Sequence, residues 1–148
     1  MESAGAPSNR VPVWYWVLSL VGLAWNAFGV MEYLNTVRST PAGLVASGLT
    51  EAGAAVMSSL PAWMVGAFAI CVFGGLLGCI LLLLRKKIAT PVLTAALAAS
   101  VVLFIGDYAF GVFAALGTIQ VVVLTLVVLI AAGLVWLSRH FERSGQLT

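Results

Sequence analysis

Residues 62–87 read AWMVGAFAICVFGGLLGCILLLLRKK, a long apolar run that ends in three cations. From Trp63 to Leu84 it carries no charged side chain. An α-helix rises about 1.5 Å per residue, so roughly 20 apolar residues cross a bilayer core of about 30 Å. The stretch therefore predicts a membrane-spanning helix at 62–84. Because Lys and Arg are retained on the cytoplasmic side, Arg85, Lys86 and Lys87 predict that this helix ends in the cytoplasm.

The composition of the whole chain is that of a membrane protein. Of the 148 residues, 62% are hydrophobic and 8% are charged, and the mean hydropathy is +1.12, whereas soluble domains are about 25% charged. We therefore predict an all-α polytopic membrane protein, a bundle of four transmembrane helices. Its predicted segments are a cytoplasmic tail at 1–12, spans at 13–34, 62–84, 92–113 and 119–137, an extracytoplasmic loop at 35–61, a cytoplasmic loop at 85–91, an outer turn at 114–118 and a cytoplasmic tail at 138–148.

The cations fall almost entirely on one side of this predicted bundle. Arg38 alone lies on the outer side, and the inner side carries Arg10, Arg85, Lys86, Lys87, Arg139 and Arg143. This asymmetry predicts that both termini are cytoplasmic. Because the cations stand at helix ends instead of forming a continuous patch, the sequence argues against nucleic-acid binding.

The loop at 35–61 carries the signals of a short helix. Thr40 followed by Pro41 is an N-cap with proline at the first helical position. Apolar residues then recur at intervals of three and four as far as Leu60, which indicates a weak amphipathic helix. We expect one or two short helices on the outer face of the bundle, interrupted near Gly48.

A short internal echo is consistent with a two-plus-two design. The residues AFGV at 27–30 recur at 109–112, in the first and third predicted spans. Both spans run outward, so the echo predicts a parallel repeat about an axis along the membrane normal. Chance identity in alanine-rich membrane sequence is the alternative.

Small residues line one side of the second predicted span. Gly74 and Gly78 stand four residues apart, and beside them runs a ladder of small residues, namely Ala67, Cys71, Gly75 and Cys79. Small side chains let another helix approach closely, so this surface is a predicted helix-packing interface, whether with the same chain or with another. The two cysteines are eight residues apart, about 12 Å along a helix, which is too far for a disulfide.

A few polar and aromatic side chains lie within the outer half of the predicted spans. They are Trp25, Asn26, Glu32, Asp107 and Tyr108. Ionisable groups inside a membrane are costly, and their default interpretation is functional. Asp107 is the deepest acid, and no Lys or Arg is available within the spans. These residues could line one polar pocket open to the outside, or they could form a hydrogen-bonded lock between the first and third spans.

The sequence contains no motif of an enzyme. There is no nucleophile with a base and an acid, no phosphate loop and no paired metal ligands, so we predict no catalytic residues, no metal and no cofactor. His140, between Arg139 and Phe141, is expected to belong to a basic edge that rests on anionic lipid headgroups.

Several residue groups resemble a known family. They are Trp14-Tyr15-Trp16, Trp25-Asn26 with Gly29-Val30-Met31 and Tyr33, Pro61-Ala62-Trp63, Ala67-Phe68-Ala69-Ile70, Val72-Phe73-Gly74-Gly75, Gly78-Cys79 and the run from Leu81 to Lys87. Together they are similar to small four-helix bacterial inner-membrane proteins that are often labelled "sugar transporter". The resemblance implies the four-helix fold and a bacterial inner-membrane location. The Pro-Gln pair of the small three-helix-repeat sugar transporters is missing from the first and third spans.

Two hypotheses for the function follow. The first is a non-enzymatic membrane module that assembles with itself, as a homo-oligomer, or with a larger membrane complex as an accessory subunit. The second is a carrier or binding protein for a small polar, sugar-like solute held in the outer half of the bundle. Membrane lipids are expected partners under both hypotheses. The small number of polar side chains within the predicted spans favours the first.

Overall fold

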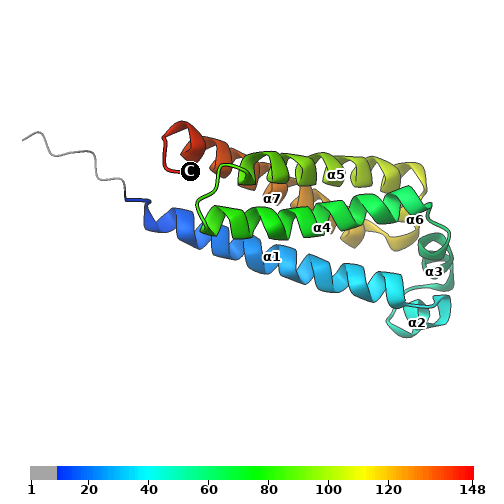
Figure 1. Ribbon diagram of the computed structural model, residues 1–148. Coiled ribbons are helices and arrows are strands. Elements are labelled where there is room, and N and C mark those ends of the chain that lie inside the picture. The colour runs from blue at the N-terminus through cyan, green and yellow to red at the C-terminus, as the bar shows by residue number, and fades with distance from the viewer. Residues whose placement is uncertain (1–9) are drawn as a thin grey trace, which may run out of the picture.

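The computed structural model describes residues 10–148, and these residues form an all-α fold (Figure 1). Four of the helices are long and apolar enough to cross a membrane, as predicted. The elements in chain order are α1 (Val13–Arg38), α2 (Pro41–Ala46), α3 (Glu51–Ser58), α4 (Ala62–Leu83), α5 (Ala89–Ala109), α6 (Val112–Leu116) and α7 (Thr118–Arg143). The predicted tail at 1–12 lies for the most part outside the described residues.

The long helices form one antiparallel bundle. The helix α4 packs against both α1 and α5, and α7 packs mainly against α5 (Figure 1). The start of α1, the α4–α5 loop and the end of α7 meet at one end of the bundle, which we call the basic end because it carries Arg85, Lys86, Lys87, Arg139 and Arg143. The short helices α2, α3 and α6 lie at the opposite end, which we call the outer end after the topology that the sequence predicts.

The first span turns its polar and small side chains inward. Its buried residues are Tyr15, Ser19, Gly22 and Asn26, which share one face at helical spacing. Large apolar side chains cover the outward faces, among them Val17, Leu18, Leu20, Val21, Phe28 and Met31. This is the reverse of a water-soluble helix and suits a helix that meets lipid. The helix continues to Arg38, so the predicted end at 34 is corrected by about one turn.

Two short helices occupy the outer loop, as predicted. Thr40 caps α2 by accepting a hydrogen bond from the Gly43 amide at 3.1 Å, and Thr50 caps α3 from the Gly53 amide at 3.0 Å. Gly48 separates them with φ +109°, a conformation that favours glycine. The helix α3 packs against α6, whereas α2 has no buried residue.

The third span ends earlier than predicted. The apolar run continues to Phe113, but α5 stops at Ala109, and Gly111 adopts φ +73° before α6 begins. Gly111 therefore interrupts the helix, and the predicted span at 92–113 becomes a span at 89–109 followed by a separate turn of helix. The echoed residues 27–30 and 109–112 thus differ in structure, because the first set lies within a continuous helix.

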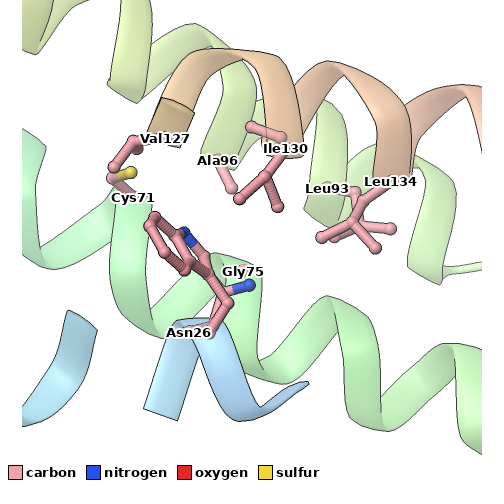
Figure 2. A pocket seen from close by; sticks show the side chains of 10 residues that line it. Asn26, Cys71, Gly75, Leu93, Ala96, Val127, Ile130 and Leu134 are labelled. Atoms are coloured by element: carbon pink, nitrogen blue, oxygen red, sulfur yellow. The ribbon is translucent and has the colours of Figure 1, made fainter. Parts of the chain in front are cut away.

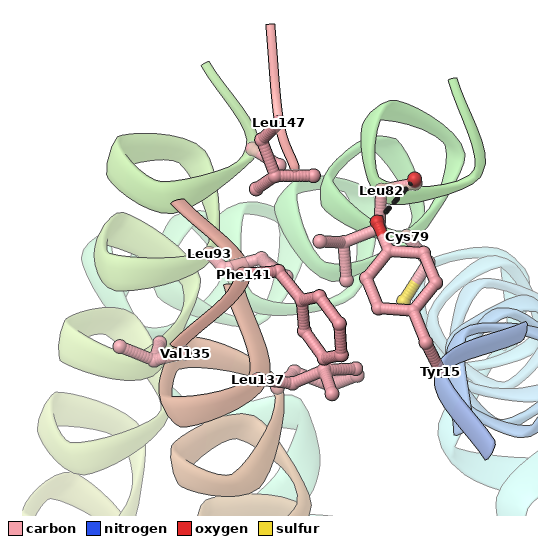
Figure 3. Packing of buried hydrophobic residues seen from close by; sticks show 10 residues of the cluster. Tyr15, Cys79, Leu82, Leu93, Val135, Leu137, Phe141 and Leu147 are labelled. Atoms are coloured by element: carbon pink, nitrogen blue, oxygen red, sulfur yellow. Dashed lines mark hydrogen bonds between the residues drawn. The ribbon is translucent and has the colours of Figure 1, made fainter. Parts of the chain in front are cut away.

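The fourth span is longer than predicted, and the tail after it is ordered. The helix α7 runs to Arg143 instead of ending at 137, because Leu137, Ser138 and Phe141 keep one face buried while Arg139 and Arg143 point outward. The following residues fold back, and Leu147 is 2% exposed in the same apolar cluster as Phe141 (Figure 3). Within the predicted cytoplasmic tail at 138–148, the first six residues thus continue α7, and the segment after them packs against the bundle.

Candidate functional site

Three glycines of α4 pack closely against two other helices of the same chain. A Cβ on Gly75 would collide with the Asn26 amide of α1, and one on Gly78 would collide with Leu93 of α5. A Cβ on Gly74 would lie 3.3 Å from the Ala96 Cβ, also on α5. The predicted small-residue interface is thus filled by α1 and α5, so within this chain it joins three spans.

The other members of this interface are also inside the bundle. Ala67, Cys71 and Cys79 are all buried, and both thiols are free. Among residues 10–148 no group of three or more His, Cys, Asp or Glu side chains could hold a metal ion. The cysteines therefore act as small packing residues at the contacts of α4.

Asn26 reaches the centre of the bundle. Its Nδ2 donates to the Gly22 carbonyl at 2.8 Å, and the Cys79 sulfur lies 3.9 Å from the same nitrogen. No residue that the structure describes donates a hydrogen bond to its Oδ1. The missing side chain of Gly75 is what makes room for this amide.

A small cavity of about 20 Å³ borders Asn26, and Figure 2 shows Ile130 and Leu134 of α7 across from it. All four spans contribute to its lining, which consists of Trp25, Asn26, Cys71, Gly75, Leu93, Ala96, Val127, Ile130, Ala131 and Leu134. A cavity needs at least about 10–15 Å³ to hold one water molecule. The space is therefore large enough for about one water molecule beside the Asn26 side chain.

Asp107 makes a separate contact near the outer end of the bundle. It is 4% exposed, lies two residues before the end of α5, and accepts a hydrogen bond from Gln120 Nε2 of α7 at 3.1 Å. Among the described residues, this is the partner of the carboxylate. Asp107 thus joins α5 to α7, not the first span to the third as the predicted lock required.

The remaining members of the predicted pocket point away from the bundle centre. Tyr108 is 78% exposed, and Glu32 is also exposed. Only Trp25 and Asn26 line the cavity described above. The five residues therefore do not line one pocket, which was one of the two alternatives. Trp25 and Asn26 lie at the cavity, Asp107 pairs with Gln120, and Glu32 and Tyr108 lie on the surface.

The basic end contains a hydrogen-bonded network that the sequence interpretation missed. The Tyr15 hydroxyl donates to the Leu82 carbonyl at 2.5 Å and joins α1 to α4 (Figure 3). Thr90 of α5 lies 2.5 Å from the Ser138 hydroxyl and donates to Glu142 at 2.7 Å, which joins α5 to α7. Ser and Thr at the start of one apolar span and the end of another are the signal that could have indicated it.

The C-terminal segment binds the α4–α5 loop. Arg85 adopts φ +57°, the left-handed conformation that usually ends a helix at glycine, and its guanidinium donates twice to the Gln146 carbonyl, at 2.8 and 3.0 Å. The Thr148 amide donates to the Arg85 carbonyl at 2.7 Å, and the Lys87 amide to the Thr148 carbonyl at 2.9 Å. The predicted orienting cations thus include one, Arg85, that also has a structural role.

Comparison with protein-family models, curated proteins and solved structures finds no match for this chain. The class of protein therefore rests on the fold and the composition. Four long apolar helices, with large apolar side chains on their exposed faces, define a multi-pass integral membrane protein of four spans.

Proposed function

We propose that this chain is a non-enzymatic integral inner-membrane module that assembles with itself or as an accessory subunit of a larger membrane complex. The observation that carries the proposal is the filled centre of the bundle. The cavity there has about 20 Å³ of free space, whereas small-molecule sites are typically about 300–1,000 Å³. A bundle packed in this way favours a role in assembly over one in carrying a solute.

The chemistry of the polar side chains supports a non-enzymatic role. Asp107 is held by Gln120, Thr90 binds Glu142, and Cys71 and Cys79 are buried free thiols. A side-chain nucleophile is commonly activated by a base within hydrogen-bonding distance. In the described residues, these polar side chains instead form hydrogen bonds that join helices.

The outer end offers a surface for assembly. None of the six residues of α2 is buried. The rings of Trp63 and Phe110 pack edge to face with centroids 5.9 Å apart, and both side chains are about half exposed. Partly exposed aromatic side chains are enriched at protein interfaces. We place the partner-binding surface here, because Gly74, Gly75 and Gly78 of α4 are already covered by α1 and α5.

The solute-carrier alternative is supported by one observation. The Asn26 cavity is lined from all four spans and includes a polar side chain, the Asn26 amide, in its wall. A sugar would need this cavity to widen severalfold, and the helix that would have to move is α1, whose packing against α7 is slight. The alternative therefore predicts a second conformation of α1.

Native mass measurement in lipid nanodiscs separates these functions. We expect the extracted protein to appear as an oligomer or with a stoichiometric companion, and changing Trp63 and Phe110 to alanine should reduce that species. Ile105→Ala, another exposed apolar position on a span, serves as the matched control. A bare monomer, together with sugar-dependent thermal stabilisation that Asn26→Leu abolishes, would favour the carrier and contradict the module.

A further inference from the structure

The last two turns of α7 present one exposed basic and aromatic face. Trp136, Arg139, His140 and Arg143 stand at intervals of three and four residues, so they share this face, and all are exposed. The buried side chains of the same turns, Leu137, Ser138 and Phe141, lie on the opposite side. The face belongs to the part of α7 that leaves the apolar span.

An aromatic stack joins this face to the start of α1. The rings of Trp136 and His140 lie nearly parallel with centroids 5.3 Å apart, and the Trp14 ring stacks on Trp136 at 6.5 Å. Trp14 also meets Phe141 at 5.1 Å. Trp side chains prefer the membrane–water interface, so the stack fixes the level at which the lipid headgroups begin.

Within residues 10–148, no acidic side chain pairs with the positive charge of this face. Of the acids that the structure describes, Glu51 begins α3, and Glu32 and Asp107 stand near the ends of α1 and α5 that are remote from the basic end. Glu142 lies on α7 itself, but it accepts the Thr90 hydroxyl of α5 at 2.7 Å and thus faces the bundle. Arg139 and Arg143 are left to attract an anion from outside the chain.

Toward the membrane centre, the same side of α7 becomes small and apolar. Gly133, three residues before Trp136, is exposed, and a Cβ there would meet nothing within 4 Å. Leu129, one further turn along, is 61% exposed. A chain of methylene groups can therefore lie directly below the Trp136 indole.

We propose that the α1–α7 edge binds an anionic phospholipid, with its phosphate at Arg139, His140 and Arg143 and one acyl chain along Gly133 and Leu129. A phospholipid is the occupant because the cations and the apolar strip are continuous on one helix face and meet at the aromatic stack. Basic pockets at the cytoplasmic ends of membrane spans bind anionic headgroups in the same way. The proposal does not depend on the assembly proposed above.

The test compares lipid retention by native mass spectrometry. Purified protein would be titrated with phosphatidylglycerol or phosphatidylcholine of identical acyl chains. We expect preferential retention of phosphatidylglycerol, weakened about fivefold for each cation removed by Arg139→Gln and Arg143→Gln. Both side chains are exposed, so their loss should leave the fold intact, which circular dichroism would check.

Matched variants at the same end of the bundle provide the controls. Lys86→Gln with Lys87→Gln removes the same charge from the α4–α5 loop and should leave the preference unchanged, while Trp136→Leu should weaken it without changing the charge. Equal loss in the Lys86/Lys87 variant, or no preference in the unaltered protein, would overturn the site. Competition by inorganic phosphate alone would show that the face binds free anions and not a lipid.

Discussion

At the residue scale, the contact between Gly75 and Asn26 places the most demanding constraint on side-chain size. A Cβ at Gly75 would overlap the Asn26 amide, so Gly75→Ala must displace that side chain or separate α1 from α4. We expect a loss of about 1–3 kcal/mol in the free energy of unfolding, the usual range for overpacking. Thermal unfolding in detergent, followed by circular dichroism, would measure it.

The same helix supplies the control for this substitution. Gly66 is exposed on α4, and a Cβ there would meet nothing within 4 Å. Gly66→Ala should therefore be neutral or slightly stabilising, because alanine is the better helix former. If Gly75→Ala and Gly66→Ala unfolded at the same temperature, the close approach of α1 to α4 would be incorrect.

The pairing of Asp107 with Gln120 makes a second prediction at this scale. Asp107→Asn keeps an oxygen that can accept the Gln120 amide hydrogen, so stability should change little. Asp107→Leu leaves Gln120 without its partner and should cost about 0.5–2 kcal/mol, the range for hydrogen bonds within membranes. Unfolding temperatures of both variants and of Gln120→Leu would test this pairing.

A double-mutant cycle decides between a structural and a charged role for Asp107. Loss of Asp107 and Gln120 together should cost less than the sum of the single losses, because the two side chains share one contact. An asparagine variant as unstable as the leucine variant would mean that the carboxylate charge is required, which contradicts the structural role.

At the scale of elements, Arg85 and Gly145 end their helices in the same way. Each has positive φ, 57° and 73°, and in both cases the next amide bonds back to a carbonyl in the last turn, Lys86 to Leu81 and Gln146 to Phe141. Glycine adopts this conformation without strain, whereas other residues lose roughly 1–2 kcal/mol. At Arg85, the hydrogen bonds from the guanidinium to the Gln146 carbonyl offset this cost.

Two substitutions at Arg85 should separate these opposing effects. Arg85→Gly relieves the backbone and loses the guanidinium bonds, so its overall stability should stay close to that of the unaltered protein. Arg85→Ala keeps the strain and loses the bonds, so it should be less stable than the glycine variant. In both, the amides of 146–148 should exchange hydrogen faster. Unchanged exchange would mean that Arg85 does not hold the C-terminal segment.

The sequence predicts where spans exist more reliably than where they end. Hydropathy located all four, because uncharged runs of this length have no other stable environment. It placed the end of α5 too late, since Phe110 and Val112 are as apolar as the helix while Gly111 breaks it. It placed the end of α7 too early, because a cation on one face does not stop a helix whose other face is buried.

The candidate site was harder to predict for a geometric reason. Position along a span gives the depth of a residue, and depth alone suggested that Asn26, Asp107 and Tyr108 share a pocket. Contact depends also on the rotation of each helix about its axis, which turns Asp107 toward Gln120 and leaves Tyr108 78% exposed. That rotation follows from packing around Gly75 and Gly78. It cannot be deduced from the spacing of residue types in a single sequence.

At the scale of the whole molecule, the gathering of cations at one end predicts the topology. In a background with Cys71 and Cys79 changed to alanine, Lys86→Cys and Ser144→Cys should be shielded from an impermeant thiol reagent in intact cells. Ser47→Cys, exposed between α2 and α3, should react. Labelling of Lys86→Cys from outside would reverse the orientation and with it the proposed cytoplasmic location of both termini.

The bonds between Arg85 and the C-terminal segment also set an order of events during synthesis. The acceptor of the Arg85 guanidinium lies 61 residues further along the chain, so the hairpin of α4 and α5 is made and can enter the membrane well before its loop acquires these bonds. Until Gln146 and Thr148 are synthesised, the loop keeps its strained residue without the contacts that offset the strain. The basic end therefore closes last, after α7 has taken its place beside α5.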